Sequence, residues 1–203
     1  MRAKLLSFLK LYEEEVSLLL WTAALLFVIR SSGIILNNYA ETAFLKRYGV
    51  EYLPIVNMLN AIATFFVTGF LTAFMGKLPG AKLLSYVFIF SGISVTLIRI
   101  LIPFGFELLY PLLFMLKSQF ELLQAMLFWN ICNDIFNTRQ SKRLFPLLTA
   151  GGVIGLILGS FGTPYFAKLF QMDNLLYLYL STTLLGAGIV QAMGRSYPSL
   201  IFS

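Results

Sequence analysis

The stretch of sequence that decides the fold spans residues 107–168 and reads ELLYPLLFMLKSQFELLQAMLFWNICNDIFNTRQSKRLFPLLTAGGVIGLILGSFGTPYFAK. It consists of an apolar segment, a short basic loop and a second apolar segment with regularly spaced glycines. Lys117 and Glu121 lie in the middle of the first apolar segment. Ionisable groups inside apolar spans, next to a basic boundary, are typical of integral membrane proteins.

The composition of the whole chain agrees with this interpretation. The chain has 203 residues, of which 59% are hydrophobic and only 12% are charged, and its mean hydropathy is +0.83. Soluble domains average roughly 45–50% apolar and about 25% charged residues. We therefore expect an all-α integral membrane protein with the lipid bilayer as its main surroundings, because only helices and closed barrels satisfy the backbone in lipid.

The residue types also exclude several functions. The chain contains no histidine and one cysteine, which excludes an internal disulfide, a Cys/His zinc cluster and the usual nucleophile–imidazole pairs of hydrolases. We expect no enzymatic activity, no catalytic residue, no metal and no cofactor, and we interpret Cys132 as a small hydrophobic residue. The net charge of +6 comes from bases in loops between apolar runs, which favours topology control over nucleic-acid binding.

Six segments are long and apolar enough to cross a bilayer, for which about 20 residues are needed. They make up one domain of residues 16–195, after an amphipathic cytoplasmic or interfacial lead-in of residues 1–15 and before a C-terminal tail of residues 196–203. An acidic triplet at residues 13–15 argues against a signal peptide. The expected spans are residues 16–36, 53–74, 83–102, 108–131, 145–169 and 175–193.

The basic residues in the loops predict the orientation. With the N-terminus inside, nine of them lie on the cytoplasmic side and three on the other, which by the positive-inside rule places both termini in the cytoplasm. The cytoplasmic set comprises Arg2, Lys4, Lys10, Lys77, Lys82, Arg139, Lys142, Arg143 and Arg195, and the opposite set comprises Lys46, Arg47 and Lys168.

Polar residues within the spans are the candidate binding residues. Lys117 and Glu121 are four residues apart and so share a helix face, with Gln124 one turn further on. One interpretation is that Lys117 and Glu121 neutralise each other and lower the cost of membrane insertion. The other is that they form a polar stripe along a central cavity, with Arg30 of the first span facing it.

Three glycines four residues apart, Gly151, Gly155 and Gly159, predict a seam where two helix backbones approach closely. We interpret the seam as a packing device. A seam of this kind can also be the place where helices rock against each other in a transporter.

Two regions resemble the ATP/ADP antiporter family, the nucleotide transporters of plastids and intracellular bacteria. The first region, residues 26–59, contains IR at 29–30 and AETAFLK at 40–46. The second resembles the family's junction between its fourth and fifth helices. It contains FWN at 128–130, Asn133, Arg139, SKRLFPL at 141–147 and GG at 151–152.

The resemblance implies a major-facilitator-like fold, of which this chain looks like the N-terminal six-helix half, in a bacterial inner (cytoplasmic) membrane. It implies transport of an anionic solute such as a nucleotide, with Arg30 attracting the anion. We expect Lys117, Glu121 and Gln124 to line the cavity, and Asn37 and Asn130 to donate hydrogen bonds to substrate. A six-helix half needs a second half, supplied by a homodimer, by another membrane subunit or by a longer polypeptide.

A second hypothesis is a non-transporting membrane anchor or assembly subunit of a larger complex, built on the same half-facilitator fold. Ser31, Ser32 and Gly33 follow Arg30, where the family carries further charged residues, and this favours the second hypothesis. Convergence of Arg30, Lys117 and Glu121 on a water-accessible interior would favour transport.

Overall fold

The computed structural model describes residues 13–198. This part of the chain is all-helical and contains no strand. The long helices are α2 (Glu13–Tyr48), α3 (Leu53–Met75), α4 (Gly80–Leu101), α5 (Leu109–Ile135), α6 (Thr138–Phe170) and α7 (Leu175–Ser196). Three short 3-10 turns, η1 (Val50–Tyr52), η2 (Ile102–Phe104) and η3 (Met172–Asn174), lie in the connections. Most of the expected lead-in and tail falls outside the described residues.

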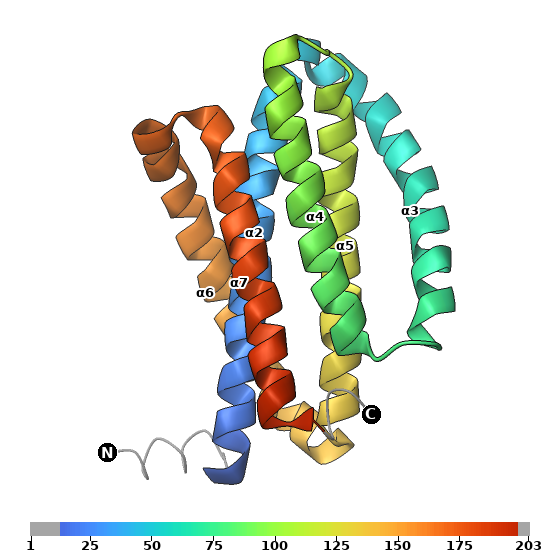
Figure 1. The fold of residues 1–203 in the computed structure, drawn as a ribbon, viewed down its shortest axis with the longest axis vertical. Helices are drawn as coiled ribbons and strands as arrows, with labels where there is room; N and C mark the ends of the chain where they lie inside the picture. Colours follow the sequence, from blue (N-terminus) through green and yellow to red (C-terminus); the bar gives the residue numbers. More distant parts are fainter. Residues whose placement is uncertain (1–12, 199–203) are drawn as a thin grey trace.

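The long helices run up and down in one bundle, so that the start of α2 and the end of α7 lie at the same end (Figure 1). The α3–α4 and α5–α6 connections lie at this end as well, and the other three connections lie at the opposite end. The bundle thus has the alternating connectivity that short loops impose on membrane helices.

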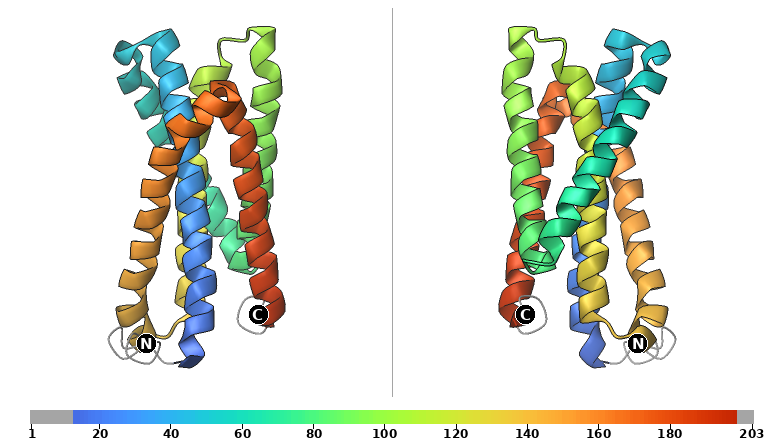
Figure 2. Two further views of the ribbon diagram at one scale, coloured as in Figure 1. Left: turned by 90° about the vertical axis from the view of Figure 1, so that its left-hand side faces the viewer. Right: turned by 90° about the vertical axis from the view of Figure 1, so that its right-hand side faces the viewer.

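Helix α2 is the central element. It packs on α6, α7 and α5, while α4 packs on α7 and α5. By contrast α3 packs mainly on α5, and only Val56 and Leu71 of α3 are buried. The two side views show α3 crossing the bundle obliquely at its edge (Figure 2).

Five of the described helices are long and apolar enough to cross a membrane. Helix α5 is not among them, although it is 27 residues long, and it carries Lys117 and Glu121 in its middle. Those two charges set α5 apart from its neighbours, and they belong to the candidate site described below.

Several helices extend beyond the expected spans. Helix α2 has 36 residues, about 54 Å at 1.5 Å per residue, whereas we expected a span that ends at residue 36. It continues because Tyr39, Ala40 and Phe44 keep the buried periodicity. In addition, Asn37, Asn38 and Glu41 form hydrogen bonds with side chains of α5 and α6. Helix α6 begins at Thr138, seven residues before the expected start, because Asn137 caps it.

The core has two main apolar clusters, one towards each end of the bundle. The first gathers residues such as Leu84, Phe88, Leu127, Phe128 and Leu148. The second gathers residues such as Leu36, Tyr39, Val95, Leu113 and Tyr179. Most of the candidate binding residues lie away from these clusters, along the contact between α2 and α5.

Candidate functional site

An ion pair joins the middle of α2 to the middle of α5. The guanidinium of Arg30 donates to the carboxylate of Glu121, with 3.4 Å between Nη1 and Oε1. The side chain of Arg30 is 33% exposed and that of Glu121 is 48% exposed. The pair therefore lies at the edge of the bundle and has an open side.

A second polar contact lies along the same two helices, towards the α2–α3 connection. The ammonium group of Lys117 donates to Oδ1 of Asn37 and, over 2.7 Å, to Oε1 of Glu41. The same group lies 4.3 Å from the centroid of the Phe114 ring. Lys117 is only 7% exposed, whereas Glu41 is 49% exposed. The buried cation is thus neutralised by a carboxylate that reaches the surface.

We call these five residues the charged ladder: Arg30, Asn37 and Glu41 from α2, and Lys117 and Glu121 from α5. Within the described residues Lys117 and Glu121 form no ion pair with each other, and each instead pairs with a residue of α2. The structure therefore disagrees with the interpretation that they neutralise each other along one helix. It brings Arg30, Asn37, Lys117 and Glu121 together.

The charges of the ladder are balanced, since two cations face two carboxylates. An isolated charge at membrane depth costs about 2.5–3.5 kcal/mol on insertion scales, and pairing reduces this cost. Arg30 therefore does not offer an anion an unpaired positive charge. An anion that reaches Arg30 has to displace Glu121 or share the guanidinium with it.

The side of the ladder that the bundle leaves open continues along α2 and α5. A Cβ atom added to Gly33, which lies between Arg30 and Asn37 in the sequence, would meet no atom within 4 Å. About two turns beyond Glu121, Trp129, Phe145 and Thr149 line a shallow, largely apolar depression between α5 and α6. The free space at Gly33 therefore marks the open side of the ladder on α2.

Two of the predicted binding residues lie elsewhere. Gln124 is 1% exposed and donates weakly to the hydroxyl groups of Ser91, at 3.4 Å, and Tyr179, at 3.5 Å. It belongs to the interior between α4, α5 and α7. The same face of α5 contacts α2 at Lys117 but α4 and α7 at Gln124. Asn130 donates to Asp134 of its own helix, over 3.3 Å, near the α5–α6 connection. The structure does not bring Gln124 or Asn130 to the ladder.

Glu41 is the residue of the ladder that we did not predict to bind. Arg30, Asn37 and Glu41 are seven and four residues apart, so they lie on one face of a helix. The shared face of these three residues can be recognised in the sequence only if the first helix continues past residue 36, where the expected span ends.

The adjacent face of α2 packs on the glycines of α6, and a Cβ atom added to Gly152 would lie 3.4 Å from Cγ of Arg30. A Cβ atom added to Gly155 would lie 2.7 Å from the carbonyl oxygen of Phe27, and one added to Gly159 would clash with Ile34 and lie 3.1 Å from the Ser31 carbonyl oxygen. The two backbones are therefore in contact. Gly151 is looser, because its added Cβ would lie 3.7 Å from Ala23. We call this contact between α2 and α6 the glycine seam. Gly152 also belongs to it, because a Cβ atom added to Gly152 would lie 3.0 Å from the side chain of Leu26.

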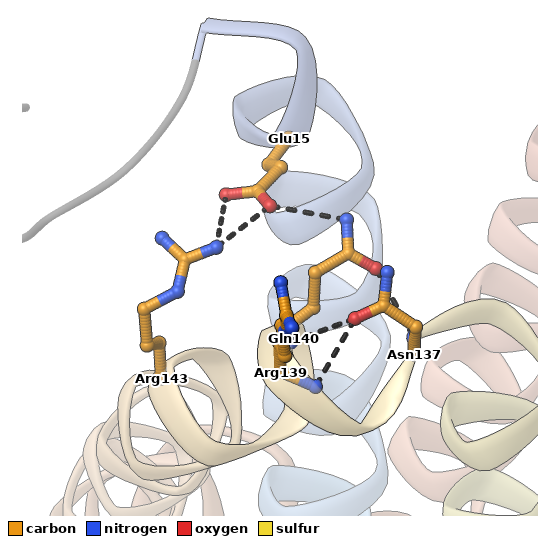
Figure 3. A network of polar contacts seen from close by, with 5 residues as sticks. All are labelled: Glu15, Asn137, Arg139, Gln140 and Arg143. Atoms are coloured by element: carbon orange, nitrogen blue, oxygen red, sulfur yellow. Dashed lines mark hydrogen bonds and ion pairs between the residues drawn. The ribbon is translucent and has the colours of Figure 1, made fainter.

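A network of polar side chains joins the beginnings of α2 and α6, next to the glycine seam (Figure 3). Asn137 caps α6 by accepting from the backbone amides of Arg139 and Gln140. The side chain of Gln140 donates to Glu15 over 3.0 Å, and Arg143 donates to the same carboxylate over 2.9 Å. Glu15 is 8% exposed. The first turn of α6 is thus fixed to the beginning of α2.

Comparison of the chain with protein families, with curated proteins and with solved structures finds no match. The described residues contain no group of three or more Cys, Asp or Glu side chains that could hold a metal ion.

Proposed function

We propose that the chain is a six-helix, transporter-like membrane domain whose charged ladder lines one wall of a solute path. In this proposal α5 is the sixth spanning helix. Its charges are tolerated in the membrane because α2 supplies partners for both of them. Both termini lie in the cytoplasm, as the basic residues of the loops favour, and the membrane is the bacterial inner membrane.

One observation carries the proposal. Glu41 and Glu121 are each about half exposed although their cationic partners, Lys117 and Arg30, belong to the middle of α5 and α2. A carboxylate turned towards lipid is costly, and intramembrane ionisable residues face a bundle interior or a water-filled cavity. The open side of the ladder is therefore the side where water, solute or a second half belongs.

The ladder suggests how an anion is bound and released. An anionic solute, such as the nucleotide implied by the resemblance to the ATP/ADP antiporters, replaces Glu121 as the counter-ion of Arg30. When the solute leaves, Glu121 takes its place again, so Arg30 always has a counter-ion. Lys117 and Glu41 offer a second exchangeable pair about three turns away along α2.

A single half leaves the path open on one side. A second half, from another copy of this chain or from a different membrane subunit, closes it, and the solute then reaches each side of the membrane by alternating access. The rigid contact between α2 and α6 allows these helices to move together as one wall.

The alternative is a non-transporting anchor or assembly subunit. The observation that favours it is the neutrality of the ladder, because every charge in it already has a partner within the chain. In that case the pairs only lower the cost of insertion, and the open side binds a neighbouring subunit permanently.

Two linked measurements separate these functions. Native mass spectrometry of the protein purified in detergent is expected to show a symmetric dimer or a pair with a second facilitator-like half. Nucleotide uptake into vesicles is then expected for the wild type and at least ten-fold less for Arg30→Ala. Recovery only within a larger complex of unlike subunits, with uptake independent of Arg30, would support the anchor and contradict transport.

A further inference from the structure

Helix α3 leaves a groove between itself and α4. Beyond their short connection the two helices stand apart from each other (Figure 1), and the space between them has a volume of about 770 Å³. Its walls are apolar and largely aromatic, with Phe66, Phe70 and Phe74 from α3 and Leu83, Val87 and Phe90 from α4. We call this space the α3–α4 groove.

The groove has the length and position of a lipid chain. Its α3 wall runs from Phe74 at the connection to Phe66, about 12 Å at 1.5 Å per residue. One leaflet of a bilayer contributes roughly half of the 30 Å hydrocarbon thickness, or about 15 Å. The groove starts at the end of the bundle and extends inward over most of one leaflet.

The two helices that form the walls of the groove, α3 and α4, carry no negative charge. No aspartate or glutamate occurs between Glu51 and Glu107, so both walls and the connection between them come from a stretch without a carboxylate. Lys77 and Lys82 lie at the groove's outer end and are exposed. An apolar slot that opens beside two lysines fits an amphiphile with a negative head.

We propose that an acyl chain of an anionic phospholipid occupies the α3–α4 groove and that its phosphate lies at Lys77 and Lys82. The lipid fills the space that side chains leave between α3 and α4, and it holds α3 against a bundle that α3 contacts mainly through α5. The groove is separate from the charged ladder, so this inference does not depend on transport.

The test is native mass spectrometry of the purified protein titrated with phosphatidylglycerol or with phosphatidylcholine of the same chains. The wild type is expected to retain phosphatidylglycerol preferentially. In the double variant K77Q/K82Q, each substitution is expected to reduce this preference roughly five-fold, since a basic residue near an anionic surface contributes about 1 kcal/mol. The matched control R139Q/K142Q removes two exposed charges from the beginning of α6 at the same end of the bundle and is expected to keep the preference.

A second variant tests the apolar part of the site. Val87→Trp fills the groove and is expected to reduce retention of both lipids, whereas the lysine variant affects only the anionic one. Tyr86→Trp, a conservative change on the same wall, provides an independent reading, because its fluorescence is expected to be quenched by brominated acyl chains.

Three results would overturn the proposal. The first is an unchanged lipid preference in K77Q/K82Q. The second is no quenching of the tryptophan at position 86 by brominated phosphatidylglycerol. The third is a change of oligomeric state in V87W at constant lipid retention, which would show that a helix of a partner subunit fills the groove instead.

Discussion

Helix α2 uses two opposite kinds of contact with its neighbours α6 and α5. At the glycine seam the backbones of α2 and α6 touch, and Gly155 has no room for a methyl group. At the charged ladder α2 and α5 meet through long side chains, and both carboxylates are about half exposed. The close backbone packing of the glycine seam has no second arrangement. The side chains of the charged ladder, by contrast, can exchange their ionic partners without a change in the helix packing.

This difference separates a structural contact from a candidate working surface. Close backbone packing stabilises membrane helices through dispersion and has no alternative arrangement of similar energy. Partly exposed ion pairs contribute little to stability, because water competes for both ions. The same helix can therefore be fixed on one face and adaptable on the adjacent face, as the proposed half-transporter requires.

The largest expected effect comes from the glycine seam. Gly155→Ala should destabilise the protein by about 1–3 kcal/mol, because the new methyl group meets backbone atoms of Phe27 that cannot move aside. Thermal unfolding in detergent measures the loss. The matched control Gly33→Ala meets no atom within 4 Å and should be neutral or slightly stabilising. Equal stability of the two variants would contradict backbone contact in the seam.

The next effect belongs to the buried end of the ladder. Lys117→Met should cost about 1–2 kcal/mol, because it leaves the oxygen atoms of Asn37 and Glu41 without their donor. The double variant K117M/E41Q should recover part of this loss, since the unpaired carboxylate is gone. Chemical unfolding of both variants measures the recovery, and a double variant that is less stable than K117M would show that the two groups are not paired.

A smaller effect is expected at the polar end of the seam. Asn137→Ala should cost about 1 kcal/mol, because the first turn of α6 loses its capping side chain. Hydrogen exchange at the amides of Arg139 and Gln140 should accelerate, since both donate to Asn137. Unchanged exchange at these two amides would mean that the cap does not hold the helix start.

The smallest effect on stability, together with the largest on activity, is expected at the open end of the ladder. Arg30→Gln should change stability by less than about 1 kcal/mol, because the pair with Glu121 is partly exposed, yet it should reduce anion uptake at least ten-fold. The reversed pair R30E/E121R should restore stability without restoring uptake. Uptake that recovers with the reversed pair would assign the two residues a structural role alone.

Much of the fold follows from patterns in the sequence. The long apolar runs predict an all-helical membrane domain, and five of the described helices are long and apolar enough to cross a membrane in the expected regions, whereas α5 is not among them. Helix ends were harder to predict. The capping box at Asn137 and Gln140 and the buried positions of α2 after residue 36 depend on local hydrogen bonds and tertiary partners, which hydropathy does not report.

The candidate site was predictable only in part. Spacing places Lys117, Glu121 and Gln124 on one face of α5, but it does not say which helix packs on that face at each level. In the structure the face meets α2 at Lys117 and the interior of α4 and α7 at Gln124. For the same reason, the four-residue spacing of Lys117 and Glu121 is compatible both with a pair along the helix and with separate partners on α2.

Thiol labelling at Gly33 tests most directly whether the side of α2 that carries the charged ladder faces water. The native cysteine, Cys132, is buried, so Gly33→Cys provides one accessible thiol, and Ile93→Cys, at an exposed apolar position of α4, is the lipid-facing control. In membranes, with a membrane-impermeant reagent applied to each side in turn, we expect rapid modification of the thiol at position 33 and none at position 93. If the thiol at position 33 is as inert as the one at position 93, the open side of the ladder does not face water, and the proposed solute path is contradicted.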